Sequence, residues 1–216
     1  MVTVPEATKK IVERSRYLTE AMSKNLINLS SLSRYIKPEI EEMLIKNVSE
    51  ASILMALKRL STNLHTPTFK NVFLTPPDMI VRSNLAEIVV LNSDTLKNKY
   101  SQILKFSQDH NKYFFTLSQG LLETTIIVSE NLKDNLLELL KNEKILNLYS
   151  KLSSITIRLP EDSILTPGVY YFLLKSLAWE EINIIETIST YLELNLIFQE
   201  KEINRAFTIL KGLFNK

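Results

Sequence analysis

The residues best suited to bind a small charged ligand surround Pro167 and Gly168, directly before an apolar helical pattern at residues 169–179. The first amides of a helix have no partner within the helix, and together with the helix dipole they attract a carboxylate. An ammonium group at the other end of the same ligand could be accepted by Glu193 or Asn183. These residue types predict a site for an amino-acid-like effector. Its predicted members are Ser163, Thr166, Pro167, Gly168, Val169, Tyr170, Asn183, Ile184 and Glu193.

A purely structural interpretation of the same residues stays open. Pro and Gly are common turn formers, Asn183 could fix the entry of a strand, and Glu193 could be a solvated residue of an amphipathic strand. The equivalent loop earlier in the chain, residues 92–95, has no glycine. Its Asp94 would repel an anionic ligand, and we expect Asp94 to cap the helix predicted at 95–106 instead.

A second candidate surface lies on a helical pattern that begins near residue 49. Successive residues of a helix are about 100° apart, which places small polar residues and a cation along one stripe. Short side chains would let this helix approach a DNA groove, and Arg and Asn are residue types that contact base edges. The same stripe could instead be the solvated side of a helical bundle. It comprises Ser49, Ser52, Ala56, Arg59 and Asn63, flanked by Lys58.

Residues for catalysis or metal binding are scarce. The sequence has no cysteine, and its 2 histidines, His65 and His110, have no ligand-type partner at a metal-binding spacing. Phosphate-binding glycine loops and nucleophile motifs are absent from the sequence as well. We therefore predict a protein without catalytic residues, without a metal and without a cofactor.

The composition indicates a helix-rich globular protein. Of the 216 residues, 45% are hydrophobic and 23% are charged. No stretch is apolar enough to span a membrane and the first residues lack a signal-peptide pattern, which predicts a cytoplasmic protein. The formal net charge is +2; residues 1–62 hold 10 basic and 7 acidic residues, a difference of +3, which leaves −1 for the rest. This excess is too small to indicate nucleic-acid binding by itself.

Hydrophobic periodicity divides the chain into four parts. Residues 1–64 are helical by pattern, and the prolines of residues 65–77 indicate a linker. Residues 78–152 and 153–216 each combine strand and helix patterns. The predicted fold class is α+β, with a helical, helix-turn-helix-like domain followed by two ferredoxin-like βαββαβ units.

The helices of the first part are predicted to be short. After an apolar stripe within residues 7–22, a short helix covers residues 28–36 and Pro38 opens a further turn. A last helix, with Ser49 as its cap, would complete a helix-turn-helix arrangement. The side chains expected to face inward near Pro38 are Ile40, Leu44 and Ile45.

The remainder of the chain contains an internal repeat. A shift of 70 positions places residues 120–130 on residues 190–200. A repeat of this length suggests two similar small domains, which are more common in ligand sensors than in enzymes. In the second copy we predict, in order, a strand at 155–159, a helix at 169–179, a strand beginning at Ile182 and Ile184, a strand at 192–198 and a helix at 203–210.

Residues 166–184 resemble the opening of an ACT domain. In that family a Pro-Gly turn, here Pro167-Gly168, leads into the first helix, and an Ile-Asn-Ile sequence, here residues 182–184, leads into the second strand. The resemblance is greatest to the tandem ACT regions of aspartate kinases. It implies that an amino acid or similar effector binds between paired ACT units.

The two units are predicted to be interleaved. After the last predicted helix, residues 211–216 are too few for a fourth strand, whereas residues 79–83 form a strand that the first unit does not need. Pairing of 79–83 with the second unit would meet both conditions. The alternatives are pairing within the first unit or an extended linker. Exposed strand edges also predict a homodimer or a larger assembly.

We therefore expect an amino-acid-sensing regulatory protein that binds double-stranded DNA through residues 1–64, as a transcriptional regulator does. The alternative is a regulatory or scaffolding protein that binds no DNA and acts on a metabolic enzyme, such as an aspartate-kinase-like partner. In either case, the effector acts only if it binds one arrangement of the domains better than another.

Overall fold

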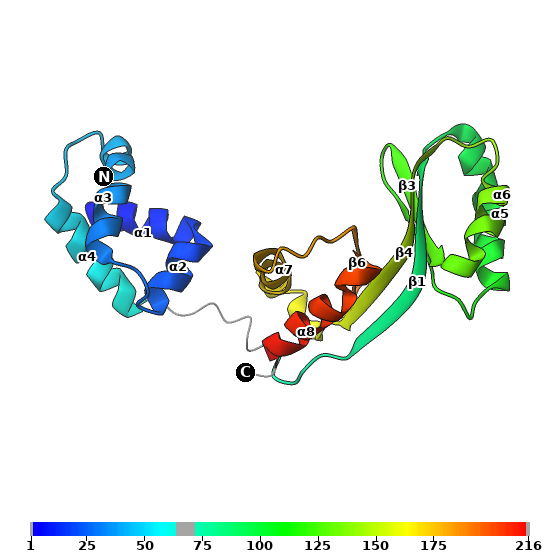
Figure 1. Cartoon of the computed structure of the whole chain (residues 1–216). Helices are drawn as coiled ribbons and strands as arrows, with labels where there is room; N and C mark the ends of the chain where they lie inside the picture. Colours follow the sequence, from blue (N-terminus) through cyan, green and yellow to red (C-terminus); the bar gives the residue numbers. More distant parts are fainter. Residues whose placement is uncertain (1, 64–71, 215–216) are drawn as a thin grey trace. The chain divides into compact units, whose positions relative to one another are not determined.

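The computed structural model describes residues 2–63 and 72–214, and the chain divides into two compact units, Met1–Lys70 and Asn71–Lys216 (Figure 1). Among the described residues, the first unit is helical and the second contains a six-stranded sheet with helices. The predicted α+β class is therefore confirmed. No helix within these ranges is long and apolar enough to cross a membrane.

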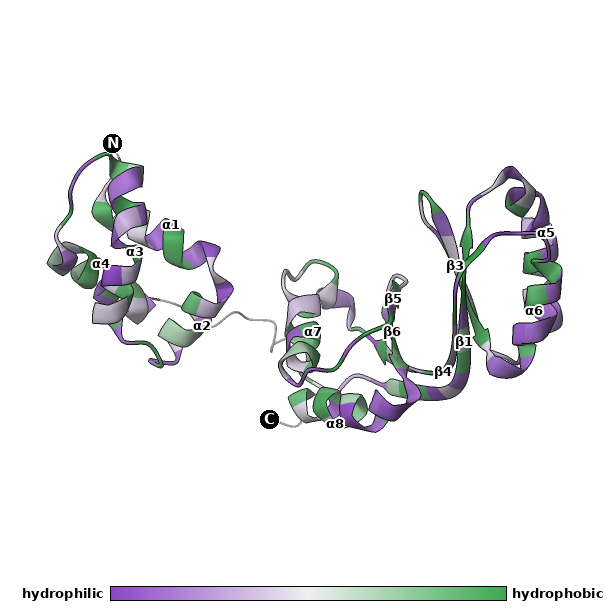
Figure 2. Ribbon diagram, turned by 45° about the horizontal axis from the view of Figure 1, so that its top comes forward, coloured by the Kyte–Doolittle hydropathy of each residue, from purple (hydrophilic) through white to green (hydrophobic). Residues whose placement is uncertain are grey.

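The first unit consists of α1 (Val4–Arg14), α2 (Arg16–Ser23), α3 (Leu29–Leu44) and α4 (Glu50–Asn63). Polar side chains cap α1, α3 and α4. At α4, Ser49 Oγ accepts a hydrogen bond from the Ser52 amide at 3.3 Å, as predicted. Thr3 accepts a hydrogen bond from the Glu6 amide, and Asn28 accepts one from the Ser30 amide at 3.0 Å. Hydrophobic and hydrophilic residues alternate along the helices (Figure 2), and the apolar faces share one core. That core includes Ala7, Ile11, Met22, Leu32, Ile36, Ile40, Ile53 and Leu57.

Helix α3 differs from its prediction in two ways. It runs through Pro38, where the sequence predicts the start of a new turn. A proline inside a helix costs about 3 kcal/mol, but Ile36 and Ile40 on either side are buried in the core, and their burial offsets that cost. Ile45, predicted to face inward, is 93% exposed because it ends α3 in a left-handed conformation with φ 52°.

The second unit is built on one antiparallel sheet with the strand order β2-β3-β1-β4-β6-β5. Its strands are β1 (Met79–Leu91), β2 (Phe115–Gln119), β3 (Glu123–Ser129), β4 (Ile145–Arg158), β5 (Glu186–Ser189) and β6 (Glu193–Gln199). Its helices are α5 (Asp94–Asp109), α6 (Lys133–Leu139), α7 (Val169–Trp179) and α8 (Ile203–Phe214). Helices α5 and α6 lie on one side of the long strands, and α7 and α8 lie on the other (Figure 1).

The long strands β1 and β4 each take part in both halves of this sheet. Residues 85–91 of β1 pair with β3, and residues 152–158 of β4 pair with β6. The beginning of β1 pairs with the second half, where Met79 lies opposite Ile157 and Arg82 lies opposite Ser154. The beginning of β4 pairs in turn with the first half, where Leu148 lies opposite Ile88.

Both long strands are irregular near their midpoints. The β1–β4 register shifts between Arg82 and Leu85 and again before Glu87. Asn84 and Lys151, at the corresponding points of the two strands, have positive φ values of 58° and 55°. Such irregularities bend strands and increase their twist. The two halves of the sheet can therefore turn toward each other.

Apolar clusters lie on both faces of the sheet. Toward α5 and α6, buried Ile88, Val90 and Ile126 pack together. The face of each half that points away from its own helices is called the inner face here. Its cluster takes two residues from each half: Leu85, Ile127, Leu152 and Ile197. Because both faces are covered, every residue from 194 to 198 in β6 is buried, whereas alternation in the sequence predicts one buried face.

Two element starts differ from their predictions. Strand β5 begins at Glu186, not at Ile182, because the Ile182 amide still bonds to the Leu177 carbonyl at 3.0 Å and closes the end of α7. Helix α5 is capped by Ser93, whose Oγ accepts the Leu96 amide at 2.9 Å, so the predicted capping role of Asp94 is wrong. The predicted helix at 169–179 is confirmed as α7.

Part of the predicted linker at residues 65–77 packs on the second unit. The centroid of the Phe73 ring lies 4.9 Å from that of Phe214 and 5.9 Å from that of Phe172. Aromatic pairs at this spacing stabilise a fold beyond simple burial. Phe73 therefore belongs structurally to the second unit. Residues 65–71 of the predicted linker lie outside the described residues.

Candidate functional site

Helix α7 begins after a tight loop that contains most of the predicted effector-binding residues. Thr166 Oγ1 donates to the Asp162 carbonyl at 2.7 Å, and the Ser163 amide donates to the Pro160 carbonyl at 2.9 Å. Gly168 precedes the helix with φ 95°, a conformation that residues with a side chain rarely adopt. Since glycine has no side chain to act as a cap, α7 starts without a side-chain cap among the described residues.

The equivalent helix of the first half, α5, has an occupied N-terminus. The Glu143 carboxylate accepts hydrogen bonds from Ser93 Oγ at 2.8 Å and Thr95 Oγ1 at 3.0 Å, and Lys99 Nζ lies 3.1 Å from it. Burial opposes ionisation of Glu143, but the hydrogen bonds from Ser93, Lys99 and Thr95 outweigh it and hold the pKa of Glu143 below its usual value. A carboxylate of the chain itself therefore occupies the start of α5.

The predicted effector residues are divided between the two ends of α7. Glu193 lies opposite Arg158, at the end of the sheet from which the Gly168 loop begins. Asn183 and Ile184 follow the C-terminal end of α7, whose 11 residues span about 16 Å. One amino acid cannot reach from Gly168 to Asn183 within a single chain. Of the other predicted members, Val169 is buried, and Pro167 and Tyr170 are exposed.

Helix α4 exposes part of the predicted DNA-contacting stripe. The exposed members are Lys58, Arg59 and Asn63 in its last two turns, together with Ser49 just before the helix. Ala56 is only 6% exposed, so its predicted place on an exposed stripe is wrong. The side chain of Ser52 takes part in a hydrogen bond within the start of the helix, because its Oγ donates to the Ser49 carbonyl at 2.7 Å.

Sequence reasoning overlooks Glu87, a carboxyl group buried on the inner face. Its side chain is 3% exposed, and its Oε2 has no hydrogen-bond partner among the described residues. Burial and, to a lesser degree, the negative charge of Glu186 raise the pKa of Glu87 to about 7. The signal that the sequence offers is a single charged residue within the otherwise apolar run 85–91.

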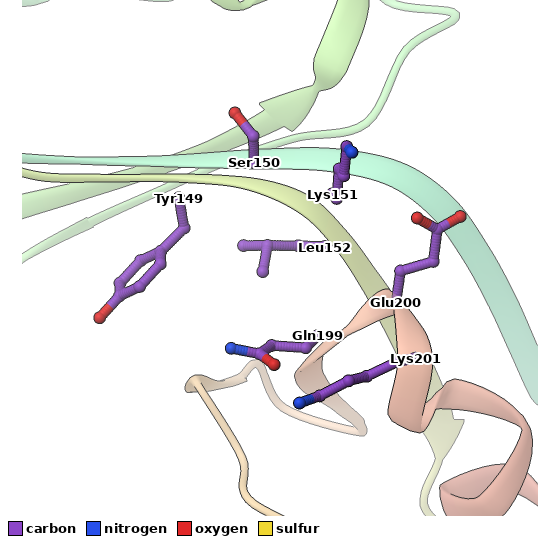
Figure 3. A pocket seen from close by; sticks show the side chains of 7 residues that line it. All are labelled: Tyr149, Ser150, Lys151, Leu152, Gln199, Glu200 and Lys201. Atoms are coloured by element: carbon purple, nitrogen blue, oxygen red, sulfur yellow. The ribbon is translucent and has the colours of Figure 1, made fainter.

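A hollow of about 270 Å³ lies where β4 bends. It is lined by Tyr149, Lys151, Leu152, Gln199 and Lys201, among others (Figure 3). None of the residues predicted to bind an effector or DNA lines it. In the described parts of the chain, no three His, Asp or Glu side chains gather in a way that could hold a metal ion.

Comparison with known proteins identifies the fold. No protein-family model and no curated protein matches the sequence. Among solved structures, the regulatory subunit of aspartate kinase from Thermus flavus matches 65% of this chain over 100% of its own length, with a TM-score of 0.53 and 12% identity. The corresponding subunit from Thermus thermophilus matches 63% of this chain over 97% of its own, with a TM-score of 0.52 and 14% identity. About two thirds of the chain therefore has the fold of an aspartate kinase regulatory subunit.

This regulatory-subunit fold also occurs within a longer kinase. The aspartate kinase of Clostridium acetobutylicum matches 68% of this chain with a TM-score of 0.55 and 14% identity, and the match spans 37% of the kinase. The likeness agrees with the predicted resemblance to the ACT regions of aspartate kinases. At such identities it extends to the fold and not to individual binding residues.

Proposed function

We propose that the chain is an amino-acid-responsive regulatory protein without catalytic activity. The observation that carries this proposal is the contrast between the N-termini of α5 and α7. Glu143 supplies a carboxylate at α5, whereas α7 follows Gly168 and has no side-chain cap in the described residues. The carboxylate of a free amino acid is chemically suited to that position. The regulatory-subunit fold supports this function, as does the description of the Clostridium kinase as an allosteric enzyme.

We infer further that the second unit consists of two interleaved ACT-like halves. The register supports this inference, since Met79 and Arg82 pair with the second half and Leu148 pairs with the first. A ligand at α7 would act on both halves, because β4 leads into the α7 loop and also pairs with β1 along most of its length. In the described residues, 79–82 and 145–150 pair on one side only, which favours association with a second copy.

A thermal-shift screen with the twenty standard amino acids tests the proposed effector response. At least one amino acid should raise Tm, since a ligand at about 100 times its Kd adds about 2.7 kcal/mol to the folded state. Gly168→Ala should weaken its binding about tenfold or more, because a side chain at φ 95° strains the loop that presents the amides.

Gly212→Ala in α8 is the matched control, because a Cβ there meets nothing within 4 Å and should leave binding unchanged. A protein whose Tm responds to no amino acid would contradict the proposed function. If the amino acid binds the Gly168→Ala variant and the unmodified chain with equal affinity, the effector does not bind at the start of α7.

A second candidate function is DNA binding by the first unit, as a helix-turn-helix-like domain. The observation that favours it is the exposure of Lys58, Arg59 and Asn63 on α4, a helix whose one acidic residue is Glu50 in its first turn. Together with the effector site, this surface would make the chain a transcriptional regulator. Without it, the chain would be a regulatory or scaffolding protein for a metabolic enzyme.

Arg59→Ala should weaken binding to random duplex DNA by about 1 to 3 kcal/mol and reduce its salt dependence. Fluorescence anisotropy across a salt series measures both effects. Lys9→Ala on α1 removes one exposed positive charge elsewhere and serves as the control. If the unmodified chain shows no salt-dependent DNA binding, the function without DNA is the correct one.

A further inference from the structure

Two rows of side chains face each other across the inner face. In the first half, the register places Thr116, Ile127, Glu87 and Tyr149 side by side on β2, β3, β1 and β4. In the second half, Glu186, Ile197, Ser154 and Arg82 lie side by side on β5, β6, β4 and β1. Ile127 and Ile197 belong to one apolar cluster, so the two rows are in contact.

The charged residues of the two rows lie at opposite ends of their contact. The guanidinium of Arg82 lies 5.6 Å from the centre of the Phe114 ring, next to the β2 end of the first row. The charge of Glu186, at the other end of the second row, acts on Glu87. One end of the contact is therefore basic, and the other contains two carboxyl groups.

The acidic end has no cation of its own. Among residues 2–63 and 72–214, neither Glu87 nor Glu186 takes part in an ion pair, and Glu186 accepts one hydrogen bond, from the Thr187 amide at 2.8 Å. Glu87 Oε2 is buried without a partner. A buried carboxylate is destabilising unless a positive charge or hydrogen-bond donors accompany it. The arrangement favours a cation from outside the chain.

The hollow at the bend of β4 adjoins Glu87 through Tyr149. Tyr149 both lines this hollow and lies directly opposite Glu87 on β1, with its side chain on the same face. Tyr149, Leu152, Gln199 and Lys201 point to one side of β4, whereas Ser150 and Glu200 point away (Figure 3). The hollow thus offers the aromatic ring of Tyr149, which lies opposite Glu87, together with an apolar side chain, an amide and the ammonium group of Lys201.

We propose that the inner face holds a second small-molecule site, which takes a primary ammonium compound between Glu87 and Glu186. The body of the ligand lies along Tyr149 and Leu152, and a polar or anionic tail meets Gln199 and Lys201. An amino acid satisfies this pattern, and so does a small amino alcohol. The site is separate from the start of α7 and joins the two halves directly, so its ligand stabilises their contact.

Isothermal titration calorimetry of the full chain tests this site with ethanolamine, glycine and glycolate as probes. Ethanolamine carries the ammonium group without a carboxylate, and glycolate carries a carboxylate without the ammonium group. Ethanolamine should bind. Glu87→Gln and Glu186→Gln should each weaken its binding about tenfold or more. Both substitutions keep the size of the side chain, and Glu87→Gln also removes a buried charge, so folding is preserved.

Glu123→Gln, which changes an exposed carboxylate at the start of β3, is the matched control and should leave ethanolamine binding unchanged. Absence of ethanolamine binding, or equal affinity in both Gln variants and the control, would overturn the site. Ethanolamine binding that is lost in Gly168→Ala but kept in Glu87→Gln and Glu186→Gln would also overturn it. Glycine binding that depends on Gly168 alone would, in that case, leave the proposed effector response at α7 intact.

Discussion

Replacing Glu87 with Gln is expected to make the second unit more stable at about pH 8, by up to about 3 kcal/mol. The pKa of Glu87 in the folded protein is about 7, against an ordinary value of 4.5, because the side chain is buried and Glu186 is negatively charged nearby. Above pH 7 the folded unit must hold a buried negative charge. Gln has the same shape without the charge, so the penalty disappears.

The same raised pKa determines how the stability of the second unit changes with pH. Because the folded-state pKa lies above the unfolded one, the folded state binds more protons between about pH 4.5 and 7, and stability falls as pH rises through that window. The Glu87→Gln variant should lack this fall. Urea denaturation followed by the fluorescence of Trp179, the single tryptophan, reports on the second unit. Parallel pH profiles of the variant and the unmodified chain would contradict the prediction, and Glu123→Gln supplies the control.

Ile127→Ala and Ile197→Ala are each expected to lower the free energy of unfolding by about 2 to 5 kcal/mol, because both side chains are fully buried. The two residues come from different halves but share one cluster on the inner face. Their effects should therefore not add, and a coupling energy of about 0.5 kcal/mol or more should remain. Amide hydrogen exchange in β3 and β6 measures the loss of stability in each half.

Ile103 provides the control for that double-mutant cycle. It is also fully buried, but it lies in α5 and belongs to the cluster on the opposite face of the first half, which does not include Ile197. Ile103→Ala and Ile197→Ala should therefore be additive. Additivity of the Ile127 and Ile197 substitutions as well would mean that the inner faces do not depend on each other for their packing.

Features that depend on neighbouring residues could be predicted from the sequence. Turn chemistry and helical periodicity within about twenty residues predict the bounds of α7. They also predict the loop at Pro167 and Gly168 and the need for a glycine there. The repeat of 120–130 at 190–200 indicated two similar halves, and β3 and β6 begin at equivalent positions within it. Such features agree with the structure because few distant contacts can override them.

The candidate site required more than local patterns. The spacing of Gly168 and Asn183 in the sequence suggests one site, but a helix of 11 residues holds them apart. Likewise, helical stepping places Ala56 beside Arg59 on one face, but Ala56 is buried whereas Arg59 is exposed. A periodic pattern shows which residues share a face. It does not show what packs against that face.

The burial of Glu87 on the inner face follows only from the tertiary structure. In the sequence, Glu87 is one charged residue within the apolar run 85–91, and nothing near it specifies what covers it. Irregularities at Asn84 and Lys151 accompany the change in register of β1 and β4, and the second half covers that face with Ile197 and Glu186. Burial, and with it the pKa of Glu87, depends on segments about 100 residues away in the chain, because desolvation is set by everything that surrounds a group in space.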